Sequence, residues 1–235
     1  MKKMIIASTS TIYGSEYLEY ILPELEIFFK DVKEILFIPY ARPSGISYKE
    51  YTMIASKAFA KISKKVVGVQ EFENSKDAVQ NSKAIFVGGG NTFVLVDTLY
   101  KNGLLSEIKE AVENGVLYFG TSAGSNITGI SMKTTNDMPI VYPPDFKTLG
   151  LIPFNLNPHY LDPDPKSKHK GETRETRIKE FHVYNDIPVL GLREGSWLEV
   201  TGQKITLKGT LSARLFQKGE KPSELNSGIV KIDRS

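Results

Sequence analysis

The stretch VLYFGTSAG at residues 116–124 places a serine directly after an apolar run that is typical of a buried strand. Its last five residues follow the pattern G-x-S-x-G, in which small neighbours of Ser122 allow a sharp turn from a strand into a helix. Such a turn lifts the hydroxyl above the carboxyl end of the strand and aims the backbone N–H of Ala123 at whatever the hydroxyl attacks. The stretch therefore predicts a nucleophilic serine at a sheet edge. The alternative is a glycine-rich turn whose serine only caps a helix.

Apolar strands alternate with amphipathic helices in the first half of the chain. Near-continuous apolar runs separated by helices are typical of a parallel sheet that is covered on both faces. Pro23 does not fit the interior of a helix, so the first helix is expected to kink or to start late. The predicted strands are 4–8, 34–40, 65–69, 84–87 and 116–119, and the predicted helices are 15–30, 48–63, 92–99 and 104–114.

The sequence changes character after about residue 130, where turns that contain proline become frequent. The apolar run 149–154 is expected to be a strand that leads toward His159. No repeat or low-complexity linker divides the chain, so we expect one α/β domain over residues 1–235. Antiparallel or mixed strands joined by tight turns are expected at 189–192, 196–200, 204–207 and 214–216.

Composition excludes several classes of protein. The 30 basic and 27 acidic residues are intermixed, so we expect no nucleic-acid partner. The chain has no cysteine, which excludes disulfides, thiolate metal ligands and a cysteine nucleophile, and which fits a reducing compartment. No window of about 18 apolar residues is present, so we expect no membrane-spanning helix, no membrane partner and a cytoplasmic location.

A second glycine-rich segment, GGGNT at residues 88–92, follows the predicted strand 84–87. Ligands of open parallel sheets bind outside the carboxyl ends of the strands, where this segment and Ser122 are both expected. The bare backbone of the triple glycine can approach a substrate oxygen and supply a second oxyanion donor. Gly89, Gly90 and Asn91 are thus candidate substrate-binding residues. A phosphate-binding loop is the alternative, but the lysine and hydroxyl of a P-loop are missing.

A serine nucleophile needs a base, for which histidine is the usual residue near neutral pH. His159 is expected at the exit of a strand, although it could also be only a turn residue after a proline. His169 and His182 lie in charged sequence and are expected to be solvated. None of the three histidines belongs to an i, i+4 pair or a carboxylate-flanked motif, so we expect no metal.

The base in turn needs a carboxylate that fixes its tautomer and stabilises its charged form. Glu194 follows the run 189–192 and precedes a glycine, so it is expected at a strand end. Asp137 lies between Ser122 and His159 in the chain, which is the order of many α/β-hydrolases. The residues alone do not decide which of the two carboxylates is the partner of His159.

Six ordered segments together resemble the S51 serine peptidases, the α-aspartyl dipeptidases. The resemblance implies a three-layer, flavodoxin-like α/β fold with a mostly parallel sheet, as in class I glutamine amidotransferases, followed by C-terminal antiparallel strands. It also implies hydrolysis of dipeptides with an N-terminal aspartate, without metal or cofactor. The segments are GGGNT at 88–92, GTSAG at 120–124, TTNDMPIV at 134–141, NPH at 157–159, KGETRE at 170–175 and GLREG at 191–195.

The resemblance assigns roles to individual residues. It makes Ser122 the nucleophile, His159 the base, and Gly90 with Ala123 the oxyanion donors. Asp137 and Glu194 both match positions proposed for the third member of the triad. One departure is Arg193, where the family pattern has proline. Its guanidinium could lower the pKa of Glu194 or fill the mouth of the site.

Recognition of an aspartyl side chain needs a cation in the pocket. Arg174 and Arg177 are three residues apart and so share one helical face. Our hypothesis is that Arg174 binds the aspartyl carboxylate in a bidentate manner and that Glu172 or Glu175 accepts the α-amine. The alternative is a surface helix with internal salt bridges.

The sequence is also compatible with three other functions. The first is a related S51 peptidase that acts on β-aspartyl or cyanophycin-like substrates, and the second is a carboxylesterase. The third is a non-catalytic ligand-binding module in which Ser122 is only a cap. The expected partner is a small peptide substrate, and either a monomer or a homodimer is compatible with the sequence.

Overall fold

Parallel strands form the centre of the larger of two sheets. The computed structural model describes residues 1–164, 166, 168 and 171–232. Within these residues the larger sheet has the order β12-β9-β8-β1-β5-β4-β2-β3, and the smaller sheet has the order β11-β10-β7-β6. Neighbours among β1 to β5 pair in parallel, as the sequence predicts. Their bounds are β1 (Lys3–Ala7), β2 (Glu34–Ile38), β3 (Lys65–Gly68), β4 (Ala84–Val87) and β5 (Leu117–Thr121).

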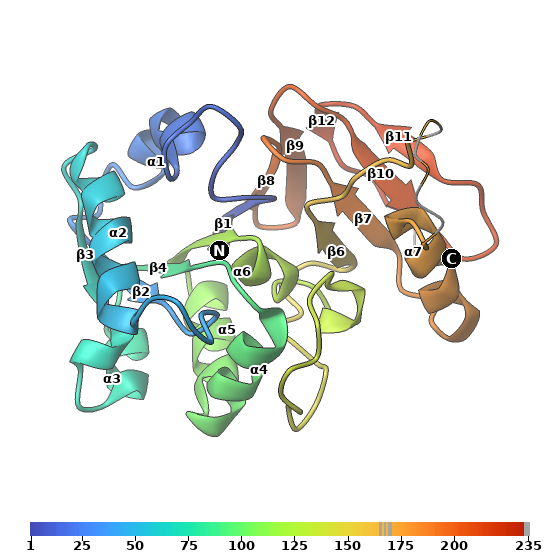
Figure 1. The fold of residues 1–235 in the computed structure, drawn as a ribbon. Coiled ribbons are helices and arrows are strands. Elements are labelled where there is room, and N and C mark those ends of the chain that lie inside the picture. Colours follow the sequence, from blue (N-terminus) through green and yellow to red (C-terminus); the bar gives the residue numbers. More distant parts are fainter. Residues whose placement is uncertain (165, 167, 169–170, 233–235) are drawn as a thin grey trace.

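Helices cover both faces of this parallel sheet and complete three layers (Figure 1). Successive strand residues point to opposite faces. Phe37 and Phe86 therefore join one apolar cluster with α1 and α2, whereas Ile38 and Val87 join another with α3, α4 and α5. The predicted three-layer α/β fold is confirmed. The helices are α1 (Leu22–Phe28), α2 (Tyr48–Ala60), α3 (Ser75–Gln80), α4 (Thr92–Lys101) and α5 (Leu104–Glu113).

Two helices differ from a simple reading of the apolar pattern. Helix α1 begins at Leu22, with Pro23 in its first turn, so the expected late start is confirmed. Proline is tolerated there because first-turn N–H groups have no helical acceptor. The sequence analysis missed α3, whose six residues are too few for a clear amphipathic period.

The C-terminal part divides its strands between the two sheets. Strands β8, β9 and β12 continue the larger sheet in antiparallel pairs next to β1, and β7 and β10 pair antiparallel in the smaller sheet. Figure 1 shows the smaller sheet and α7 on one side of the molecule, with α2 and α3 on the other. The expected C-terminal strands are confirmed. The bounds are β6 (Asn155–Pro158), α7 (Arg174–Tyr184), β7 (Val189–Leu192), β8 (Trp197–Thr201), β9 (Lys204–Lys208), β10 (Ala213–Phe216), β11 (Ser223–Leu225) and β12 (Gly228–Ile229).

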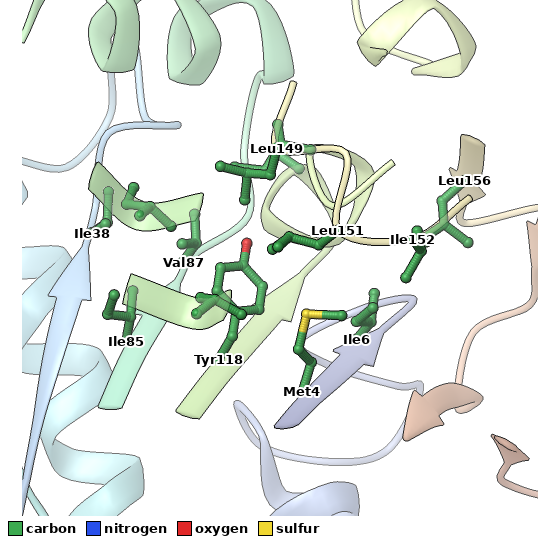
Figure 2. Close-up of a cluster of buried hydrophobic side chains, with 14 of the residues drawn as sticks. Met4, Ile6, Ile38, Ile85, Val87, Tyr118, Leu149, Leu151, Ile152 and Leu156 are labelled. Carbon is green, nitrogen blue, oxygen red and sulfur yellow. The ribbon is translucent and has the colours of Figure 1, made fainter. Parts of the chain in front are cut away.

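The apolar run 149–154 is not a strand, so this prediction was wrong. Leu149, Leu151 and Ile152 lie over the sheet residues Met4 and Ile6 and are buried (Figure 2). Their backbone N–H groups donate to carbonyls of the loop that follows Ser122, at positions 127 and 128. The run is apolar because it covers a sheet face, and the strand itself, β6, begins only afterwards.

The chain turns sharply between β5 and the short helix α6 (Ala123–Asn126). Ser122 has φ 53° and ψ −111° at this turn. A non-glycine residue in such a conformation costs about 1–3 kcal/mol, so surrounding contacts must enforce it. A Cβ on Gly124 would lie only 2.2 Å from the backbone oxygen of Val87. The second glycine of the motif therefore permits the close packing of α6 against β4.

Replacing Gly124 with alanine is expected to lower the free energy of unfolding by about 1–3 kcal/mol, because the new methyl group overlaps backbone that cannot rotate away. Urea denaturation measures the loss. Gly68→Ala is the control, since its methyl group would meet the flexible side-chain amide of Gln70. Equal losses in the two variants would contradict the role given to the Gly124–Val87 approach.

Candidate active site

Three side chains from three strand ends meet in a hydrogen-bonded line. Ser122 follows β5, His159 follows β6, and Glu194 stands two residues after β7. Nε2 of His159 lies 2.8 Å from Oγ of Ser122. Nδ1 of the same ring lies 2.6 Å from Oε1 of Glu194. A ring bound on both nitrogens in this way can take a proton from the hydroxyl while the carboxylate stabilises the resulting charge.

The backbone of His159 is held by a residue that the sequence analysis missed. His159 has a φ of 55°, in the left-handed region. Its N–H donates to Oγ of Ser8 at 2.9 Å, and the Ser8 hydroxyl donates to the carbonyl of Leu192 at 2.7 Å. Ser8 is fully buried and follows β1 directly. The strand-end argument that singled out Ser122 applies equally to Ser8 and could have found it.

The triple-glycine loop lies against Ser122. A Cβ on Gly89 would come within 2.9 Å of Cβ of Ser122, and Gly90 has a φ of 144° with its missing Cβ 2.2 Å from the oxygen of Ala41. The hydroxyl of Tyr51 donates to the carbonyl of Gly89 at 3.1 Å. Within the described ranges, the backbone N–H groups of Gly90 and Ala123 have no protein acceptor. Both are therefore free to bind an oxygen of a ligand.

Asp137 does not bind His159 but lies in the same hollow. One oxygen, Oδ2, accepts from the backbone N–H of Thr92 at 2.7 Å, from its hydroxyl at 2.6 Å and from the Thr135 hydroxyl at 3.0 Å. The other oxygen, Oδ1, has no hydrogen-bond donor in the part of the chain that the structure describes. The carboxylate is thus fixed at the start of α4. The hollow is lined by Thr92, Ser122, Ala123, Asn126, Thr135, Asn136, Asp137, Pro158 and His159.

Asparagine side chains hold the loop that carries Asp137. Asn91 caps α4 by accepting from the N–H of Val94 at 3.1 Å, and it donates to the carbonyl of Met138 at 2.9 Å. Asn136 donates to the carbonyl of Pro158 and accepts from Asn157, both at 2.7 Å. The last two asparagines were not singled out from the sequence, because polar residues in a turn-rich segment carry no distinct signal.

Arg174 is the first residue of α7 and has no hydrogen bond or ion pair within the described residues. Its partial burial lowers the pKa of the guanidinium, the charge of Arg177 lowers it further, and the charge of Asp137 acts in the opposite direction. Arg174 and Asp137 are therefore close enough to interact.

The two glutamates beside Arg174 are already paired. Glu175 binds Nζ of Lys179 at 2.6 Å and lies 3.6 Å from the Arg214 guanidinium, while Glu172 lies 3.2 Å from Arg177. Each carboxylate therefore already shares its charge with a basic side chain, whereas Oδ1 of Asp137 has no hydrogen-bond donor among the described residues.

Arg193 and His182 are placed differently from what the sequence suggests. The Arg193 guanidinium does not fill the mouth of the site, because it binds Asp162 and Glu224. His182 is buried, and its Nε2 lies 3.1 Å from the carbonyl oxygen of Ile187, so the expectation of a solvated ring was wrong. Burial lowers the pKa of His182. His169 lies outside the described residues.

Metal-binding clusters and membrane-spanning helices are both absent from the part of the chain that the structure describes. This part contains no group of three or more histidine, aspartate or glutamate side chains that could hold a metal ion. In the same ranges, no helix combines the length and the apolar character needed to cross a membrane.

The chain is similar to known peptidases over most of its length. The sequence model of "Peptidase family S51" matches residues 4–208. A protein named "Peptidase E" from Streptomyces coelicolor is 48% identical over 225 residues, which cover 96% of this chain and 91% of the relative. A "Probable alpha-aspartyl dipeptidase" from Drosophila melanogaster is 45% identical, with 92% and 90% covered. The crystal structure of a peptidase from an acI-B1 actinobacterium shares the fold, with a TM-score of 0.74, 16% identity, and 99% and 97% covered.

Replacing Ser8 with alanine is expected to destabilise the protein and to lower the reactivity of Ser122 toward an organophosphonate. The change leaves the N–H of His159 without an acceptor, at about 1–3 kcal/mol, and removes one of the two donors to the carbonyl of Leu192, which keeps the N–H of Tyr160. Thermal unfolding and the labelling rate measure the two effects. Ser10→Ala is the control, since the Ser10 hydroxyl makes no hydrogen bond to any described residue. A Ser8 variant that matches this control would contradict the role given to Ser8.

Proposed function

The chain belongs to peptidase family S51, and from this premise we propose that it is a serine-type dipeptidase that hydrolyses dipeptides with an N-terminal aspartate. The observation that carries the proposal is the line from Ser122 through His159 to Glu194, with contacts of 2.8 and 2.6 Å. The names of the relatives, peptidase E and alpha-aspartyl dipeptidase, support the same substrate class.

In the proposed mechanism, the Ser122 hydroxyl attacks the carbonyl carbon of the aspartyl residue while Nε2 of His159 takes its proton. The Nδ1–H of His159 donates to Glu194, which fixes the tautomer and stabilises the imidazolium. The imidazolium then protonates the leaving amine. Water, activated by the same ring, attacks the acyl-enzyme and releases aspartate.

The backbone N–H groups of Gly90 and Ala123 bind the oxyanion in this mechanism. Gly90 lies on the loop after β4 and Ala123 begins α6, both next to Ser122, and neither N–H has a protein acceptor within the described residues. Preorganised donors of this kind stabilise the transition state by about 3–4 kcal/mol each, because they need no reorganisation during the reaction.

Glu194 is the proposed third member of the triad, and Asp137 has a separate task. The N-terminal aspartyl unit carries an ammonium group and a carboxylate close together. We assign the carboxylate to Arg174, whose guanidinium has no ion pair among the described residues, and the ammonium group to Oδ1 of Asp137. The contacts of Oδ2 with Thr92 and Thr135 hold that acceptor in place. A matched pair of opposite charges would favour aspartyl substrates over neutral ones.

Two variants test the proposed triad. Ser122→Ala and Glu194→Gln are each expected to lower kcat for Asp-Leu by about 10⁴-fold or more, with little change in thermal stability. Amino acid release and calorimetry measure the two quantities. Wild-type turnover of β-Asp-Leu or of simple acyl esters in preference to Asp-Leu would favour one of the alternative hydrolases. A wild-type protein that neither hydrolyses Asp-Leu nor reacts with an organophosphonate would favour a binding module.

Two further variants test aspartyl recognition. Asp137→Asn is expected to lower kcat/KM for Asp-Leu by about 10- to 100-fold, since a charge-assisted hydrogen bond is lost, but not for succinyl-Leu, which lacks the α-amine. Arg174→Met is expected to cost several kcal/mol of transition-state binding for Asp-Leu and little for Asn-Leu. Steady-state kinetics on the three substrates measure these effects. Equal losses on all substrates would contradict the assigned contacts.

A further inference from the structure

The side chain of Arg193 is the centre of an ionic cluster next to the proposed triad. Its Nε and Nη2 donate to the two carboxylate oxygens of Asp162, both at 2.8 Å. Nη1 and Nη2 donate to Glu224 at 2.9 and 3.1 Å, and Nη1 also donates to the carbonyl of Ser212 at 2.8 Å. The side chain is only 15% exposed. This guanidinium is therefore held on all of its polar edges.

Arg193 and its partner Asp162 belong to the two loops that carry Glu194 and His159. Asp162 lies three residues after His159, and Arg193 lies directly before Glu194. The segments 159–162 and 193–194 are thus joined at both ends. The Arg193–Asp162 hydrogen bonds join one end, and the Glu194–His159 contact joins the other. If one loop moves away from the other, the Arg193–Asp162 and Glu194–His159 contacts must both lengthen.

A third residue strengthens the same junction. The N–H of Tyr160 donates to the carbonyl of Leu192 at 3.1 Å, so the two loops leave their strands side by side. The guanidinium of Arg193 also lies over the Tyr160 ring, with 5.6 Å between its carbon and the ring centroid. Arg193 therefore packs on one loop while its own backbone belongs to the other.

The carboxylates around Arg193 also keep its charge away from Glu194. An unpaired guanidinium beside Glu194 would compete with His159 for that carboxylate. Hydrogen bonds from Arg193, Ser212 and Arg214 lower the pKa of Glu224 to about 2 against the opposing effect of its burial, and the bonds to Asp162 and Glu224 raise the pKa of Arg193. The pairing therefore favours the charged forms of both Arg193 and Glu224.

We propose that Arg193 is a positioning residue that holds Glu194 against His159 by clamping the loop of His159 through Asp162. It does not contact the substrate. The inference rests on the proposed triad but not on the identity of the substrate, because it concerns how Ser122 is activated.

The test compares Arg193→Gln with Arg214→Gln in the full-length chain. Arg214 belongs to the same cluster, since it binds Glu224 at 2.9 Å, but within the described residues its side chain has no hydrogen bond to Asp162 or to any other residue of the two triad loops. The measurements are kcat and KM for Asp-Leu, the rate of labelling by an organophosphonate, the thermal unfolding temperature and the far-downfield NMR resonance of the His159 Nδ1–H. Asp162→Asn serves as a second variant that weakens the clamp from its other side.

Arg193→Gln is expected to lower kcat and the labelling rate by about 10- to 100-fold, as for a small misplacement of catalytic groups, with KM unchanged. The Nδ1–H resonance should disappear, and Asp162→Asn should act in the same direction. Arg214→Gln should retain kcat, the labelling rate and the Nδ1–H resonance, even if its unfolding temperature falls as much as that of Arg193→Gln. Normal kcat, labelling and resonance in Arg193→Gln, or equal losses of kcat in the two arginine variants, would overturn the inference. If the organophosphonate labels the wild type and Arg214→Gln faster than Arg193→Gln, but the wild type does not cleave Asp-Leu, only the proposed substrate is overturned.

Discussion

The candidate active site depends on the way Ser8 joins the two sheets. Ser122 belongs to the larger sheet, where Thr121 pairs with Ala7 of β1, whereas His159 and Glu194 follow two paired strands of the smaller sheet. The hydroxyl of Ser8 accepts from the backbone of His159 and donates to Leu192, over 151 and 184 residues of chain. These two hydrogen bonds join the end of the first strand to the ends of β6 and β7. Without these bonds, each sheet could keep its own structure, but the Ser122 hydroxyl and the His159 imidazole would no longer be held within hydrogen-bond distance.

Much of the fold and part of the site followed from the sequence for a simple reason. Continuous apolar strands are buried on both faces, so their ends mark one edge of the sheet, and Ser122 could be placed there from local patterns alone. His159 was also expected at a strand exit, but its strand is β6, which belongs to the smaller sheet, and not the run 149–154. The choice between Asp137 and Glu194 could not be made in this way, because both stand near strand or helix ends. It depends on which loop turns toward the ring, and that is a tertiary property. The error at residues 149–154 has the same origin, since burial by packing and burial by strand pairing leave the same apolar signature.

Asp137, Glu175 and Glu194 carry the same functional group, but their neighbours place each carboxylate in a different environment. Asp137 accepts hydrogen bonds from the first N–H of α4 and from the hydroxyls of Thr92 and Thr135. Glu175 of α7 is paired with Lys179 and lies 3.6 Å from the Arg214 guanidinium of β10. Glu194, by contrast, has only the imidazole as a hydrogen-bond partner within the described residues. Of these three carboxylates, the one with the fewest competing partners faces the His159 ring, and this feature cannot be recognised from a residue type or its spacing.

The exposure of the His–Glu pair makes outside restraint necessary. The side chains of His159 and Glu194 are 37% and 53% exposed. Ion pairs in contact with solvent contribute only about 0–1 kcal/mol, because water screens the charges and the side chains lose entropy on pairing. An attraction of this size does not by itself keep Nδ1 and Oε1 within 2.6 Å through each catalytic cycle. The geometry must instead be imposed by the backbone on both sides, where the left-handed conformation of His159, its bond to Ser8 and the junction at Tyr160 leave few alternative positions for the two loops.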